Sequence, residues 1–137
     1  MTTADTFFGA TLAFTTQSSL VFDIISGGRS GLTIERIDTT HAGTSGQLKT
    51  SMAADLADAG TYEFEVVHDP NFNIDTYIGV SDTITITYPV PAGGSSGAIK
   101  AFTGHVSSYD ETLPIDDRMT ASIVLSIDSA ISHTAST

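Results

Sequence analysis

The side-chain pattern between residues 119 and 127 constrains the fold of this chain more than any other feature. Apolar residues stand at every second position: Met119, Ala121, Ile123, Leu125 and Ile127. The positions between them hold Thr120, Ser122, Val124 and Ser126. A period of two is typical of a β-strand with one face in a core. The second face carries almost no charge, so we expect it to meet solvent or a neighbouring subunit.

This strand is the second of a pair that spans residues 102–127, joined by a polar turn region. The turn contains Pro114 and the pair Asp116-Asp117. Asp116 and Asp117 could form half of a carboxylate site, but a glycosidase needs a second carboxylate across a cleft. We interpret them as turn and strand-entry residues that make local backbone hydrogen bonds.

Strand patterns recur along the chain, at residues 9–15, 20–25, 32–37, 61–68, 82–88 and 98–107. In the 61–68 segment, Tyr62, Phe64 and Val66 point one way. Glu63 and Glu65 point the other way, which predicts a solvated, anionic face. The chain is therefore predicted to be mainly β, a two-sheet β-sandwich of about seven or eight strands in one domain over residues 1–137.

One short helix is predicted around residues 70–78. Asp69 is suited to the N-cap and Pro70 to the first helical position. Apolar residues follow at Phe72, Ile74, Tyr77 and Ile78, and Gly79 is suited to end the helix. Such a helix would plug one open flank of the sandwich.

Four segments lack a regular pattern. Residues 1–8 are expected to form an N-terminal arm, and residues 128–137 a flexible tail. Residues 26–31 are glycine-rich but lack the Gly-Lys-Ser/Thr ending of a phosphate-binding loop, which favours a plain loop. Residues 38–60 are predicted to be a long loop that another molecule orders, with a possible helical turn at Met52–Ala57.

The charge balance argues against nucleic-acid binding. Five Lys and Arg against sixteen Asp and Glu give a net charge of −11. Binding to phosphate needs a basic patch, which so few cations do not supply. No basic leader or membrane-spanning apolar stretch is recognised, so we expect a protein made in a cytoplasm.

No pattern of catalytic or metal-binding residues is found. The chain has no cysteine, so disulfides and thiolate metal sites are excluded. The four histidines, His41, His68, His105 and His133, lack metal-ligand spacing. No serine lies in Gly-x-Ser-x-Gly, and no tryptophan is present for sugar stacking. The sequence predicts a protein that is not an enzyme and has no cofactor.

Three segments in order resemble the major tail tube proteins of long, flexible-tailed bacteriophages. Residues 37–44, IDTTHAGT, resemble the family's segment leading into its long loop. Residues 56–60, LADAG, with the strand after them and Asp69-Pro70, resemble its run into the helix. Residues 102–106, FTGHV, and 113–121, LPIDDRMTA, resemble its closing hairpin. Together they cover most of residues 32–127.

The resemblance implies rings of six subunits that stack into a tail tube, with one sheet of each subunit joining a continuous inner β-barrel. Genomic DNA passes through the lumen without specific binding, and Glu63 and Glu65 are the candidates for facing it. The long loop implies inter-ring contacts for His41, Gly43, Thr44, Gly46, Lys49, Asp55 and Asp58. The implied partners are copies of this chain and the tape measure, tail terminator and tail tip proteins, with no membrane. The implied place is the tail of a virion assembled in the host cytoplasm.

Two other functions are compatible with the sequence. One is an acidic β-sandwich that serves as a binding or adhesin module. The other is a ring protein of the neck or the tail terminator. The first predicts a monomer or small oligomer with an aromatic-lined pocket, whereas the tube predicts rings of six and filaments.

Overall fold

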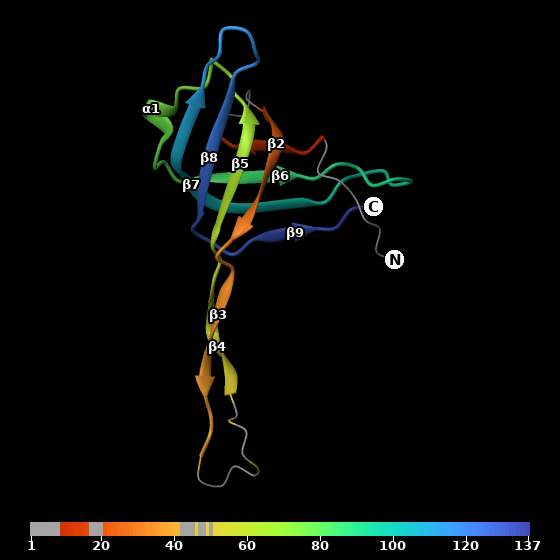
Figure 1. Cartoon of the computed structure of the whole chain (residues 1–137). Helices are drawn as coiled ribbons and strands as arrows, with labels where there is room; N and C mark the ends of the chain where they lie inside the picture. The colour runs from red at the N-terminus through yellow and green to blue at the C-terminus, as the bar shows by residue number, and fades with distance from the viewer. Residues whose placement is uncertain (1–8, 17–20, 42–45, 47–48, 50) are drawn as a thin grey trace.

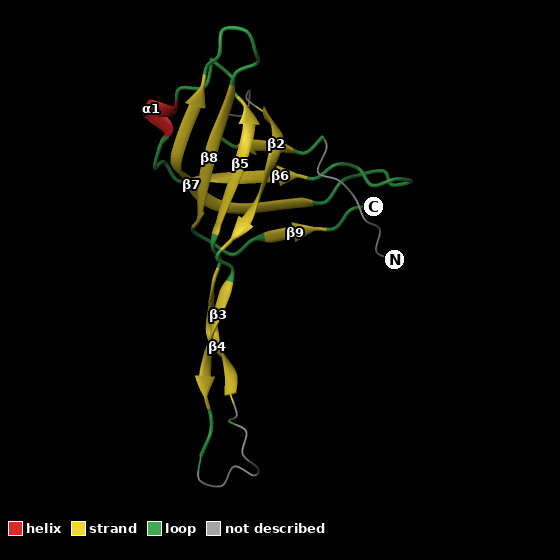
Figure 2. Cartoon of the chain, in the orientation of Figure 1, coloured by secondary structure: helices red, strands yellow, loops and turns green. Residues whose placement is uncertain are grey.

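A computed structural model describes residues 9–16, 21–41, 46, 49 and 51–137, and shows a β-barrel from which one long hairpin projects (Figure 1). The strands are β1 (Thr11–Phe14), β2 (Val21–Ser30), β3 (Thr33–Asp38), β4 (Ser51–Asp58), β5 (Thr61–Val67), β6 (Asp82–Thr87), β7 (Ile99–Thr112), β8 (Thr120–Ile127) and β9 (Ser132–Thr134). The helix α1 spans Ile74–Tyr77. Strands dominate the described chain (Figure 2), so the predicted mainly β class with one short helix is confirmed.

The two layers of the predicted sandwich are joined into one closed barrel. The strand order is β6-β1-β2-β5-β8-β7-β9, and an additional pairing of β6 with β7 closes six of these strands on themselves. Strand β7 makes closure possible because it is long enough to serve both layers. Its first half pairs with β6 as far as Gly104, and its second half pairs with β8 from Gly104 to Thr112.

The barrel interior is filled by the apolar residues that the period-two patterns predict. Tyr62, Phe64 and Val66 are buried on β5, while Ala121, Ile123 and Leu125 are buried on β8. Tyr62 stacks on Phe64 of the same strand and on Phe102 of β7, with ring centroids 5.4 and 5.6 Å apart. Stacked aromatic pairs add stability beyond the area that they bury.

The helix is shorter than predicted and starts later. It begins at Ile74 after the N-cap Asn73, so Asp69 and Pro70 do not start it. Asp69 instead forms a turn, in which its Oδ1 accepts a hydrogen bond from the N–H of Asn71 at 2.9 Å. That local bond competes with a helical start. The predicted end is right, because Gly79 follows the C-cap with a φ of 77°.

Residues around the helix cover one end of the barrel. The Phe72 and Tyr77 side chains are buried against Phe14, with ring centroids 6.1 and 5.2 Å from it. Phe22 joins the same cluster at 5.1 Å from Phe72. The helix therefore packs as the predicted plug, although it has only four residues.

The glycine-rich segment 26–31 is mostly strand, not the predicted loop. Strand β2 continues to Ser30 and pairs with β5, with Gly27 opposite Phe64 and Gly28 opposite Glu63. A Cβ on Gly27 would collide with the carbonyl oxygen of Glu63. Glycine is thus required here for the close approach of β5, not for a turn.

The segment after Ile127 is also more ordered than predicted. It forms β9, which pairs with the start of β7. Ile131 packs against the core, and the backbone N–H of Thr137 donates to the carbonyl of Ser96 at 3.2 Å. Pairing with a neighbouring strand and one apolar anchor hold a segment whose own sequence has no strand pattern. No described helix is long and apolar enough to cross a membrane.

A buried carboxylate, Asp82, ties the helix to the barrel. Its Oδ2 accepts hydrogen bonds from the Tyr77 hydroxyl at 2.6 Å and from the N–H and hydroxyl of Thr16 at 3.0 and 2.6 Å. Burial disfavours the charged form, but the hydrogen bonds from Thr16 and Tyr77 outweigh it, so the pKa of Asp82 lies below its usual range. Burial of Tyr77 and the hydrogen bond between its hydroxyl and Asp82 raise the pKa of Tyr77.

Replacing Asp82 with asparagine is expected to lower the free energy of unfolding by about 1–3 kcal/mol at pH 7, because charged hydrogen bonds are lost from a buried site. A lowered pKa contributes stability that is present above the unfolded-state pKa of about 3.9 and lost as the pH falls through the folded-state pKa. The difference between Asp82→Asn and the unmodified chain should therefore shrink below about pH 4. Urea titrations of both proteins at pH 7 and pH 3 measure this difference in unfolding free energy. An equal difference at the two pH values would contradict a stabilising role for the Asp82 carboxylate.

Candidate functional site

The strands β2, β5, β8 and β7 present a polar face to the outside of the barrel. Register places Glu63 between Gly28 and Val124, and Glu65 between Ser26 and Ser122. The remaining outward positions are Ser30, Thr61, Val67, His105, Ser108, Asp110, Thr112, Thr120 and Ser126. These outward positions carry three carboxylates and no lysine or arginine. The uncharged face predicted for residues 120–126 lies at its centre.

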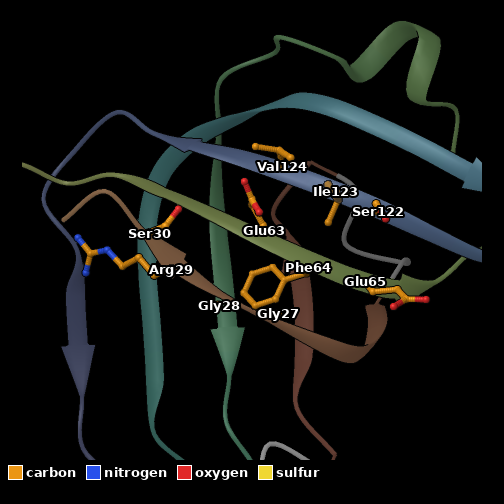
Figure 3. Close-up of a pocket in the computed structure, with 10 residues that line it drawn as sticks. All are labelled: Gly27, Gly28, Arg29, Ser30, Glu63, Phe64, Glu65, Ser122, Ile123 and Val124. Carbon is orange, nitrogen blue, oxygen red and sulfur yellow. The ribbon is translucent and has the colours of Figure 1, made fainter.

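A shallow depression of about 440 Å³ lies over β2, β5 and β8 on this face (Figure 3). It is open because Gly28 has no side chain, and a Cβ there would meet no atom within 4 Å. Glu63 and Glu65 stand exposed beside it, as their alternation predicts. The lining holds no histidine or tyrosine to act as a base or acid. Its charged lining residues are Glu63, Glu65 and Arg29, so the depression is an open surface of net negative charge and lacks the grouped acid and base of a catalytic centre.

Strands β2 and β7 form the two edges of this four-stranded face, and part of each edge strand lacks a second strand partner. Strand β2 pairs with β1 only as far as Asp23, and from Ile24 to Ser30 it pairs with β5 alone. Beyond Gly104, β7 pairs with β8 alone. Figure 1 shows these two strands on opposite sides of the four-stranded face. Unpaired strand edges offer N–H and C=O groups to another chain.

The hairpin of β3 and β4 projects from the barrel, and we call it the arm (Figure 1). It replaces most of the long loop predicted for 38–60, and the possible helical turn at Met52–Ala57 is strand β4. Pairing with β3 overrides the helix preference of its Ala, Met and Leu residues. The element contacts of the described residues place no third strand against the arm.

Large apolar side chains of the arm are exposed. Ile37 lies opposite Met52, and the pairing of β3 with β4 shifts register between Ile34 and Arg36, so Leu56 lies in the irregular part of β4. Leu56 is 85% exposed, and both Ile37 and Met52 are about half exposed. A lone two-stranded hairpin is marginally stable in water, and exposed apolar surface of this kind marks an interaction site.

The base of the arm is fixed by contacts with the barrel. Gly31 and Gly60 face each other there with φ values of 78° and 79°, a conformation that favours glycine. The Arg29 Nε donates to the carbonyl of Ala59 at 2.9 Å, and its guanidinium lies over the Tyr62 ring. These contacts set the direction in which the arm leaves the barrel.

The residues predicted for inter-ring contacts fall in different places. Gly43 and Thr44 lie outside the described residues, while His41, Gly46 and Lys49 lie beyond the paired part of the arm. Asp55 is exposed on β4. Asp58 has a local role, because its Oδ1 accepts the N–H of Gly60 at 2.9 Å. The exposed Leu56 is missing from the predicted set, because its only sequence signal is a large aliphatic residue among Ala and Asp.

The predicted turn residues lie together in the loop between β7 and β8. There the Oδ1 of Asp117 accepts the N–H of Arg118 at 2.8 Å, which is the kind of local backbone bond predicted for the Asp116-Asp117 pair. Pro114 lies in the same loop, next to the fully exposed Ile115.

His68 and His105 make polar contacts with neighbouring side chains, and Nε2 of His68 lies 3.9 Å from the Glu111 carboxylate. Nδ1 of His68 lies 2.7 Å from the Tyr109 hydroxyl, and Nδ1 of His105 lies 2.8 Å from the Asp128 carboxylate. Burial, with Glu111 and Asp69 nearby, raises the pKa of Tyr109 to about 12. Within the described ranges, no three His, Asp or Glu side chains are grouped to hold a metal ion.

The fold is shared with several solved structures, two of which are described as a tube terminator and a tube terminating cap. The sheath/tube terminator of an extracellular contractile injection system superposes on this chain with a TM-score of 0.67. The two sequences are 11% identical, and the match covers 98% of this chain and 99% of the terminator chain. The tube terminating cap of the anti-feeding prophage is 11% identical, with coverages of 98% and 93% and a TM-score of 0.66. Hcp1 from Flavobacterium johnsoniae is 11% identical, with coverages of 92% and 94% and a TM-score of 0.57.

These likenesses concern the fold. Neither a protein-family model nor a curated protein matches the sequence. None of the three solved structures is described as an enzyme. The chain therefore has the β-rich fold of tube and terminator proteins, which is the coarser form of the resemblance found in the sequence.

Proposed function

We propose that this chain is the structural protein of a tail-like tube, in which rings of the chain stack along one axis. The observation that carries the proposal is the pair of unpaired edges on β2 and β7. Strand β2 and strand β7 run in opposite directions across the four-stranded face, since each neighbouring pair is antiparallel. The β2 edge of one copy can therefore pair with the β7 edge of the next in an antiparallel sheet.

Repetition of this pairing gives a closed ring when a whole number of rotations between neighbouring copies completes one full turn. The outer face of each copy would then form the wall of one inner β-barrel, as the resemblance implies for rings of six. Closure into a barrel leaves no unpaired edges, which removes the aggregation hazard of an open sheet. The outer side of each ring would be the β1 and β6 side of each copy.

The chemistry of the outer face suits passage of DNA through such a lumen. Glu63, Glu65 and Asp110 would repel phosphate, and these carboxylates outnumber Arg29, the described cation that lines the depression on this face. Serine and threonine fill most of the remaining positions, with Val67, Val124 and His105 among them, and none of these positions holds a phenylalanine, tyrosine or tryptophan ring for bases to stack on. DNA would thus pass without adhering. The assembled tube would belong to the tail of a virion or phage-like particle, with terminator and tip proteins at its ends.

A second candidate is a ring that terminates a tube. The solved structures described as a tube terminator and a tube terminating cap favour it, because both share this fold over nearly the whole chain. A terminator forms single rings that bind the end of a tube, whereas a tube protein forms filaments of itself. The exposed arm favours the tube protein, since it offers a stacking contact in every copy.

Negative-stain microscopy of the purified chain over a range of concentrations tests the proposal. The tube protein is expected to give long filaments with a central channel above a threshold concentration. Single rings that do not stack would favour the terminator instead. A monodisperse monomer at high concentration would contradict both and favour a binding module.

Stacking should change how readily trypsin cuts the arm. Trypsin cleaves after Arg36 in β3 and Lys49 beyond it, and both lie outside the barrel. A hairpin without a third strand opens readily, so the free protomer should be nicked at these sites. In tubes we expect cleavage to slow by about tenfold or more, because opening is opposed by the neighbour. Mass spectrometry of timed digests measures the cleavage rates. Equal rates in the free protomer and in tubes would show that the arm takes no part in assembly.

A further inference from the structure

We propose that the loop between β7 and β8 of one copy inserts apolar side chains into a pocket at the start of β2 on the neighbouring copy of the same ring. This inference rests on the proposed function, because it adds a side-chain contact to the lateral pairing of β2 with β7. The pocket has a volume of about 500 Å³ and lies where β1 meets β2. We call it the end pocket.

The lining of the end pocket is mostly apolar. Ala10 and Ile24 are buried, while Ile25 is 36% exposed and Val67 adds a further apolar side chain from β5. The charged lining residues are one aspartate and one arginine, so the lining has no net charge. A pocket of this composition favours an uncharged apolar side chain over a charged one.

The end pocket lies at the point where the edge of β2 becomes available to another chain. Strand β1 covers this edge as far as Ile24, whose N–H donates to the carbonyl of Ala10 at 3.1 Å. The turn at Gly9, with a φ of 91°, precedes that cover. Over residues 25–30, the described chain gives β2 only β5 as a strand partner.

The available edge of β7 has the same length. Strand β6 covers the start of β7, and the N–H of Gly79 extends that cover by donating to the carbonyl of Val106 at 3.0 Å. Among the described strands, only β8 pairs with residues 107–112. Antiparallel pairing that uses both available stretches in full therefore places Ile25 opposite Thr112 of the neighbouring copy.

In this register the loop after Thr112 reaches the end pocket. Leu113 arrives beside Ile24 of the neighbour, and Ile115 follows two residues later. Leu113 is 57% exposed, and Ile115 is fully exposed and so has no packing partner in its own copy. Pro114 between them has a fixed φ, which limits the conformations of the loop. The loop and the start of β2 also lie at the same end of the barrel (Figure 1).

The contact would fix the register of the lateral pairing. The available stretch of β2, residues 25–30, reads ISGGRS and has no alternating apolar pattern. Backbone pairing specifies register only weakly in a glycine-rich strand. An apolar side chain that enters one defined pocket selects a single register. Every copy then has the same stagger relative to its neighbour, and this stagger sets the geometry of the closed barrel.

Disulfide cross-linking tests the docking, and the cysteine-free chain provides a clean background. The variant with Ile115→Cys and Ile25→Cys places one thiol on the loop and one in the end pocket. Oxidised rings or tubes of this variant should give a ladder on a non-reducing gel that ends at the number of subunits in one ring, as counted by microscopy. The matched variant with Ile115→Cys and Val90→Cys, whose second thiol lies in the loop between β6 and β7, should remain monomeric.

The outcomes separate this inference from the proposed function. Rings or tubes of the first variant that stay monomeric on the gel, or equal cross-linking of both pairs, would overturn the docking and leave the tube standing. A ladder that continues beyond one ring would show a contact between stacked rings and would also overturn the docking. Absence of rings and tubes from the unmodified chain would overturn the proposed function and the docking with it.

Two serine substitutions decide the question if the cysteines themselves prevent assembly. Ile115→Ser and Ile25→Ser should each raise the threshold concentration for assembly by about tenfold, as expected when a buried aliphatic side chain is lost from a contact. Because both changes remove the same contact, the double variant should raise the threshold no further than the worse single variant. A threshold that Ile115→Ser leaves unchanged, or effects that multiply in the double variant, would overturn the docking.

Discussion

Leu56→Asp is expected to abolish tube formation while the barrel stays folded. Leu56 is the most exposed of the large apolar residues on the arm, and it contacts no core residue. The barrel should lose less than about 0.5 kcal/mol of unfolding free energy, as is usual for an exposed position. Burying an aspartate at an apolar contact between copies costs far more. Sedimentation and negative-stain microscopy measure assembly, and urea unfolding measures the barrel.

Val90→Asp is the matched control for this change. Val90 is also an exposed apolar residue, but it lies in the loop between β6 and β7, away from the arm. It should assemble as the unmodified chain does. If Leu56→Asp still formed tubes at an unchanged threshold, the arm would have no role in stacking.

The double variant Glu63→Lys and Glu65→Lys is expected to convert the outer face into a surface that retains DNA. Both residues are exposed on β5, and each replacement exchanges a negative charge for a positive one. Repetition of two lysines in every copy of a ring would line the lumen with cations, and phosphate binding by such a surface is strong at low salt. Tubes assembled with short duplex DNA should then sediment with it, and the binding should weaken steeply as salt rises.

The control variant Asp116→Lys and Asp117→Lys changes the net charge by the same amount. These residues lie in the loop between β7 and β8, outside the outer face. Tubes of the control should release DNA at a lower salt concentration than tubes of the β5 variant. Equal salt dependence for both would mean that net charge alone acts, and that Glu63 and Glu65 do not face the lumen.

Much of the barrel could be predicted because local pattern and tertiary structure agree there. Tyr62, Phe64 and Val66 alternate with two glutamates, so burial of one face fixes the register of β5. The same reasoning places Ile123 and Leu125 inside the barrel. Gly79 ends the helix because a positive φ is needed after the C-cap.

The features that sequence reasoning missed depend on contacts between distant residues. Gly27 is in a strand because the backbone of β5 passes so close to it, and no local signal reports this. Met52 and Leu56 stand among alanines, and Ala, Met and Leu all have good helix propensity, so only pairing with β3 makes this segment a strand. Closure of the barrel depends on β7 changing partners at Gly104, which a period-two pattern cannot reveal. The candidate surfaces were therefore predicted in part, with Glu63 and Glu65 found and Leu56 missed.

The pairing of β6 with β7 makes folding independent of protein concentration. The buried core is complete within one copy, so a subunit needs no neighbour to bury it. Proteins whose folded subunit exists only in the oligomer melt at temperatures that rise with concentration. Below the assembly threshold this barrel should melt at one temperature at every concentration. Tubes that dissociate would release folded subunits that can be used again.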